Sequence, residues 1–109
     1  MAYKQALAER VRKVLAGETG LTEREAFGGL SFLVNGNMSV GVIGDELVVR
    51  VGPAAFENVL AQDHARPFDF SGRPMKGWVF VATDGLVSDT GLAGWVERGL
   101  TFARSLPPK

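Results

Sequence analysis

The densest group of chemically capable side chains lies in one short segment that is rich in glycine and proline. Its members are His64, Arg66, Asp69, Arg73 and Lys76. Two guanidinium groups and an ammonium group suit the binding of a phosphate or a carboxylate, because arginine offers two parallel donors in one plane. The segment therefore predicts an anion site, and such a site would make the protein a small-ligand-binding domain.

A structural role for the same side chains is the competing interpretation. Asp63 and Asp69 carry the charges needed to pair with Arg66 and Arg73. Pairs of this kind would hold a loop against the rest of the domain, and long loops in compact domains often need such internal ties. The sequence alone leaves both interpretations open.

His64 is the only histidine and the strongest single candidate for catalysis. An imidazole beside Asp63 can act as a general base where a third group orients it. No serine or cysteine nucleophile motif accompanies His64, and one histidine with scattered carboxylates is too few ligands for a metal site. We therefore expect no catalytic residues, no metal and no cofactor, in a protein that is not an enzyme.

The composition is that of an ordinary globular domain. Hydrophobic residues make up 46% of the 109 positions, and 12 basic side chains balance 12 acidic ones. A neutral balance gives no electrostatic footprint for nucleic acid or an anionic membrane. No apolar run approaches the roughly 18 residues of a membrane span, and no signal peptide is recognisable. We expect one domain over 1–109, located in the cytoplasm, with no nucleic-acid or membrane partner.

Three short apolar runs between 27 and 51 predict a three-stranded antiparallel meander. Asn35-Gly36 separates the first two runs, and this dipeptide is the strongest short-range hairpin signal because both turn residues need positive φ. Gly44-Asp45 supplies the second tight turn. The preceding stretch, 22–27, is predicted to be a short strand or an extended lead-in.

Helices and a further strand are predicted around the meander. Apolar residues recur with helical spacing over 2–16 and again from Ser88 or Asp89 to about 106. Pro53 suits the first turn of a short helix. A strand is expected over 76–83 and a loop over 63–75. This order predicts an α+β domain with helices flanking an antiparallel sheet.

One face of the predicted sheet carries apolar side chains where polar ones are expected. Alternation along the strands places Leu33, Ile43 and Val48 on this face, with Val79 or Val81 as further candidates. An exposed apolar patch usually marks a surface for a protein partner or for self-association. The other interpretation is that a helix or the C-terminal segment covers the face.

The glycines and apolar residues of two segments resemble those of a known family. The first segment contains Phe27-Gly28-Gly29, Phe32-Leu33-Val34-Asn35-Gly36, Gly44-Asp45-Glu46-Leu47 and Arg50-Val51-Gly52; the second contains His64-Ala65-Arg66-Pro67-Phe68-Asp69-Phe70 and Gly72-Arg73-Pro74-Met75-Lys76-Gly77. From about Arg24 onward the chain resembles the N-terminal domain family of TfoX, also called Sxy.

That resemblance implies a fold with the order α-β-β-β-α-β-β-α, similar to secretion chaperones. It also implies a bacterial regulatory role, because full-length members are positive regulators of competence that act with the cyclic-AMP receptor protein. The family supplies no catalytic residue. Since the chain ends at Lys109, we expect a stand-alone member without the second, helical domain and do not expect a role in competence.

Two functions compete at this point. The first is a non-enzymatic interaction domain that uses a sheet face or edge to bind a protein partner or to bind itself in a homodimer. The second is an anion-binding domain that uses the 64–76 segment. An enzyme based on His64 ranks third.

Overall fold

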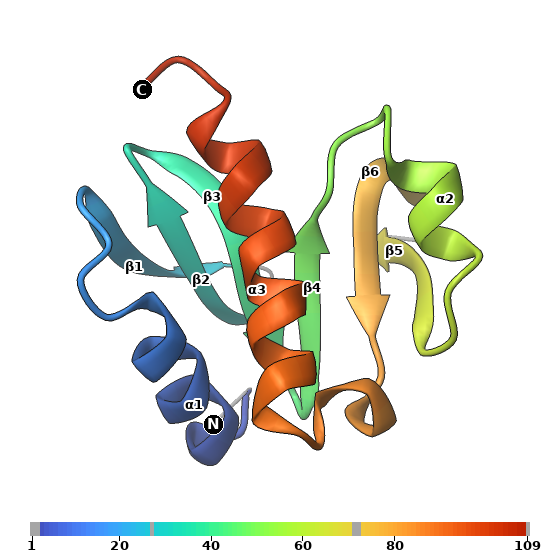
Figure 1. Ribbon diagram of the computed structural model, residues 1–109, viewed down its shortest axis with the longest axis horizontal. Coiled ribbons are helices and arrows are strands. Elements are labelled where there is room, and N and C mark those ends of the chain that lie inside the picture. Colours follow the sequence, from blue (N-terminus) through green and yellow to red (C-terminus); the bar gives the residue numbers. More distant parts are fainter. Residues whose placement is uncertain (1–2, 27, 71–72, 109) are drawn as a thin grey trace.

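The predicted meander is the centre of a six-stranded antiparallel sheet (Figure 1). The structure, a computed structural model, describes residues 3–26, 28–70 and 73–108, so Phe27 lies outside the described part. Asn35 and Gly36 both have positive φ, 52° and 85°, as the predicted hairpin turn requires. The predicted α+β class and the meander are therefore confirmed.

Four strands and one helix make up the first half of the chain. They are α1 (Gln5–Leu15), β1 (Leu21–Ala26), β2 (Gly29–Val34), β3 (Asn37–Ile43) and β4 (Glu46–Arg50). The extended lead-in that the sequence predicts is β1, which pairs along its whole length with β2. The meander itself is β2, β3 and β4.

The second half adds two strands, two α-helices and one short 3₁₀ helix among the described residues, and it corrects one prediction. Its elements are α2 (Phe56–Leu60), β5 (Ala65–Phe70), β6 (Arg73–Val81), the short 3₁₀ helix η1 (Thr83–Leu86) and α3 (Asp89–Arg104). The prediction of a loop over 63–75 is wrong, because β5 occupies most of that stretch and β6 begins there. Pro67 argues against a strand in the sequence, because proline cannot donate a backbone hydrogen bond. However, β5 is an edge strand, and an edge position tolerates a residue without a backbone N–H.

The order of strands across the sheet is β1-β2-β3-β4-β6-β5. The β4–β6 pairing joins the meander to the later hairpin, and β1 and β5 are left as the two edges. Figure 1 shows α1 and α3 lying across one face of the meander, with α2 beside β6 and β5. Residues of all three helices join one hydrophobic core with the inward residues of the strands.

Helix α3 approaches β3 closely at one point. A Cβ atom added at Gly99 would lie 2.4 Å from the backbone oxygen of Ser39. This distance is a steric clash, and glycine avoids it because it has no Cβ atom. Of the two predicted starting residues, Ser88 caps the helix, because its hydroxyl accepts a hydrogen bond from the backbone N–H of Gly91 at 2.9 Å. The position of α3 on the sheet is therefore fixed by a backbone-to-backbone contact.

The outer face of the sheet, opposite the helices, carries the three predicted apolar residues. Leu33 and Val48 are buried there, with 8% and 1% of their surface exposed, and Ile43 is half-buried. Val48 stands between Gly41 and Phe80 on the neighbouring strands. The predicted apolar face is therefore hardly accessible to solvent at Leu33 and Val48.

The register of β6 corrects the further candidates for this face. Val79 and Val81 belong to the core under the helices. Phe80 stands opposite Val48, and Trp78 stands opposite Arg50, so these two aromatic residues lie on the outer face instead.

Candidate binding groove

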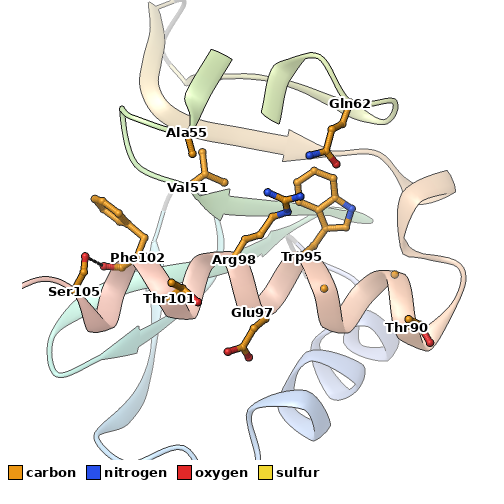
Figure 2. A pocket seen from close by; sticks show the side chains of 12 residues that line it. Val51, Ala55, Gln62, Thr90, Trp95, Glu97, Arg98, Thr101, Phe102 and Ser105 are labelled. Atoms are coloured by element: carbon orange, nitrogen blue, oxygen red, sulfur yellow. Dashed lines mark hydrogen bonds between the residues drawn. The ribbon is translucent and has the colours of Figure 1, made fainter. Parts of the chain in front are cut away.

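A groove of about 760 Å³ lies between α3 and the chain that runs from the end of β4 into α2 (Figure 2). Its residues come from these two sides: Val51, Ala55, Gln62, Thr90, Gly91, Gly94, Trp95, Glu97, Arg98, Thr101, Phe102 and Ser105. The volume falls in the range of small-ligand sites, roughly 300 to 1,000 Å³. It is larger than two other concave surfaces in the described part of the chain, which have volumes of about 230 and 320 Å³.

Two aromatic side chains of α3 form the apolar part of the groove. Trp95 and Phe102 are two helical turns apart, so they share one face of the helix. Trp95 is buried, with 8% of its surface exposed. Phe102 packs over Gly52, where an added Cβ atom would lie 2.5 Å from the ring and where φ is +87°. Glycine at 52 therefore lets the Phe102 ring lie against the backbone that follows β4.

Arg98 is the positive charge of the groove. Its guanidinium carbon lies 5.3 Å from the centre of the Trp95 ring, within the range of a cation–π contact. Within the part of the chain that the structure describes, no carboxylate pairs with Arg98. The other charged residue of the groove, Glu97, accepts a hydrogen bond from Arg104 at 3.1 Å. In Figure 2 the Glu97 carboxylate points to the opposite side of α3 from Ala55 and Gln62.

A second arginine touches the groove from behind. The Arg50 guanidinium carbon lies 5.0 Å from the Trp78 ring centre and 5.2 Å from that of Phe102. Burial between these rings lowers the pKa of Arg50. Guanidinium groups nevertheless stay protonated in proteins, so the Phe102 end of the groove carries positive charge as well.

The predicted 64–76 site has a different organisation from either sequence interpretation. Arg66 donates two hydrogen bonds to the carboxylate of Glu46, both 2.6 Å long. Its guanidinium also lies over the Phe80 ring, 4.6 Å from the ring centre. These hydrogen bonds raise the pKa of Arg66. The expected pairing of Arg66 with Asp63 or Asp69 is therefore corrected: Glu46 of β4 is the partner of Arg66.

The other residues of that segment do not gather around Arg66. His64 is exposed with a positive φ of 75°, and its backbone oxygen accepts a hydrogen bond from Ala82 N at 2.8 Å. Asp69 and Lys76 are exposed on β5 and β6, and no hydrogen bond links them to each other or to His64 among the described residues. The side chain of Arg73 lies outside the described part. In that same part, no three His, Asp or Glu side chains come together as a metal site would require.

Sequence reasoning missed the groove because it arises from distant segments. The helical spacing predicted up to about residue 106 includes Trp95, but neither Arg98 nor Phe102 was singled out. Helical periodicity places these residues on α3 and says nothing of α2 lying beside them. No local signal in the sequence marks the site.

The fold and the groove define a small α+β domain whose helices pack on one face of an open antiparallel sheet. The chain belongs to the TfoX N-terminal domain family, which matches it over residues 13–103. The resemblance read from the sequence is thereby confirmed. A comparison with curated proteins gave no significant match. Among the described helices, none combines the length and the apolar character that crossing a membrane takes.

Proposed function

We propose that this TfoX N-terminal domain is a non-enzymatic interaction module that holds a segment of a partner protein in the groove between α2 and α3. The observation that carries the proposal is the groove itself, in which Trp95, Phe102 and Arg98 line one concave surface. Aromatic residues and arginine are enriched among the residues that dominate protein–protein binding. Binding of an amphipathic segment in an apolar groove is also a common mode of peptide recognition.

The two edges of the sheet support the choice of the groove over strand addition. Pro67 interrupts the donor pattern of β5, and proline on an edge strand is a common obstacle to pairing with another chain. On β1, Glu23, Arg24 and Glu25 place charges along the other edge. Two copies of β1 could pair so that the helix-covered faces of both sheets lie on the same side. Such a pairing places Glu23 opposite Glu23 or Glu25 of the second copy, and like charges in that position are destabilising. Both edges thus disfavour a homodimer formed by extending the sheet.

A regulatory role is part of the proposal. A domain with no reaction of its own acts through what it binds, and membership in the TfoX N-terminal domain family supports this kind of role. We place its action in the bacterial cytoplasm, as the sequence leads us to expect. The groove is favoured over an anion site at 64–76, because the Arg66 guanidinium already binds Glu46.

Site-specific photocrosslinking in cells that naturally produce the protein tests the proposal. The photoreactive residue p-benzoylphenylalanine replaces Thr101 in the groove or, as the matched control, the exposed Thr22 on the outer face of β1. We expect a discrete protein adduct from position 101 and none of that mass from position 22. Equal adducts from both positions, or none from position 101, would contradict the proposal. An adduct of twice the chain's mass would identify a second copy as the occupant.

A further inference from the structure

We propose that the groove recognises a carboxylate that stands next to a bulky apolar group. This inference rests on the proposed function, and it specifies the occupant: the partner segment presents an Asp or Glu side chain to Arg98 and a large apolar side chain to Phe102 or Trp95. The partner is thus an acidic, amphipathic segment of a protein. The surroundings of Arg98 give the most direct support for recognition of a carboxylate.

Charge complementarity is the first argument. Four other arginines of the chain pair with its own carboxylates, namely Arg10 with Asp89, Arg12 with Glu9 and Glu23, Arg66 with Glu46, and Arg104 with Glu18 and Glu97. Arg98 makes no such pair within the described residues, although it lies one position from Glu97. An occupant that supplies the missing carboxylate can form a bidentate, charge-assisted hydrogen bond, which is stronger than a bond between neutral groups.

The orientation of Arg98 is the second argument. Trp95 is one helical turn before Arg98, and its ring holds the guanidinium 5.3 Å from the ring centre. A guanidinium that already lies on a ring loses less freedom when it binds, because its planar donors are held in one place. In Figure 2 the Arg98 side chain extends from α3 toward Val51 and α2, into the groove.

The spacing of the groove residues is the third argument. Phe102 follows Arg98 by four positions on α3, which corresponds to about 6 Å along the axis. Acidic and apolar side chains four positions apart on a partner helix are separated by about the same distance. A segment of that pattern can place its carboxylate on Arg98 and its apolar side chain on Phe102 at the same time. Val51 and Ala55 then cover the apolar side chain from the opposite wall.

Two small probes that differ only in charge test the inference in solution. They are 2-naphthoate and its neutral counterpart 2-naphthamide, titrated into the protein while the indole N–H signals of its two tryptophans are followed by NMR. Trp95 reports on binding at Arg98, whereas Trp78, whose ring contacts Arg50 behind Phe102, reports on binding through Arg50 instead. We expect 2-naphthoate to shift the Trp95 signal with a dissociation constant on the order of 1 mM, and 2-naphthamide to bind at least about tenfold more weakly.

Variants assign that preference to Arg98. Arg98→Gln should remove the difference between the two probes, and Arg98→Lys should keep part of it because the charge remains without the planar pair of donors. Arg66→Gln, a change in an arginine that is already paired, should leave the preference intact. Equal affinity for both probes, a shift at Trp78 instead of Trp95, or no saturable shift would overturn the inference.

Photocrosslinking at position 101 separates failure of this inference from failure of the proposed function. If Arg98→Gln leaves the adduct intact, the groove binds a partner but not through a carboxylate, and only the inference is overturned. If the photoreactive residue at position 101 gives no adduct in the protein that keeps Arg98, the proposed function fails whatever the two probes show. A strong loss of adduct in Arg98→Gln, with Arg66→Gln unchanged, supports both.

Discussion

Two arginines on opposite faces of the sheet make the same aromatic contact and have different surroundings. Arg66 lies over Phe80 on the outer face, and Arg98 lies over Trp95 in the groove. Arg66 forms an ion pair with Glu46 through two hydrogen bonds. Arg98 pairs with no carboxylate among the described residues. Stacking on a ring therefore does not by itself separate the two arginines; what separates them is the carboxylate partner that Arg66 has and that Arg98 lacks among the described residues.

The apolar residues around the two arginines differ in the same way. On the outer face Val48 is buried by its strand neighbours within one chain. In the groove the exposed positions Gly94, Thr101 and Ser105 carry no large side chain, so one side of α3 is uncovered beside Trp95. The outer face is thus complete on its own, and the groove remains open to a partner.

The comparison predicts opposite responses to a new carboxylate on each face. Val48→Glu places a charge among apolar neighbours, where it lacks both water and a partner, and should lower the free energy of unfolding by about 3 kcal/mol or more. Thr101→Glu adds the same group at an exposed groove position and should change it by less than about 0.5 kcal/mol. Urea denaturation of both variants measures the difference. Equal losses would show that the outer face is no more closed than the groove.

Two glycines of α3 test the same contrast along one helix. Gly99→Ala forces a methyl group against the Ser39 backbone oxygen, 2.4 Å away, and should cost about 1 to 2 kcal/mol after the gain in helix propensity. Gly94→Ala meets no atom within 4 Å and should stabilise the protein by about 0.5 to 1 kcal/mol. Thermal and urea unfolding give both values. Destabilisation by Gly94→Ala would mean that the groove side of α3 is not open.

The fold was predictable from the sequence where local rules decide the structure. The Asn35-Gly36 turn, the meander and the Ser88 cap of α3 each depend on residues close together in the chain. β5 was missed because Pro67 is a strand breaker except at an edge, and the strand order that makes β5 an edge is a long-range property.

The site was less predictable for the same physical reason. Spacing correctly put Val48 opposite the core, but only the register shows that Gly41 and Phe80 shield it. The sequence segment with the most charges contained Arg66, whose partner is twenty positions away at Glu46. The groove needs α2 and α3 side by side, and no spacing within α3 predicts that arrangement.

The smallest effects concern the pH dependence of stability, in which paired and unpaired arginines should differ. Arg104 donates hydrogen bonds to Glu18, and this contact lowers the pKa of Glu18 below its usual value near 4.5. A carboxyl group whose pKa is lower in the folded state stabilises the fold above its usual pKa, and that contribution is lost as the pH falls through the folded-state value. At low pH the contribution of the Arg104–Glu18 pair to the free energy of unfolding should therefore be lost.

Arg104→Gln should consequently lower the free energy of unfolding by at most about 1 kcal/mol at pH 7, because Arg104 is partly exposed and solvent weakens the pair. Its difference from the unmodified protein should shrink as the pH falls below about 4.5. Arg98→Gln should stay within about 0.5 kcal/mol of the unmodified protein at pH 7 and at pH 3, since no carboxylate among the described residues pairs with Arg98. Urea midpoints measured from pH 7 to pH 3 check both variants. If Arg98→Gln lost stability at pH 7 and regained it in acid, Arg98 would have an internal carboxylate partner, and its availability to an external one would be refuted.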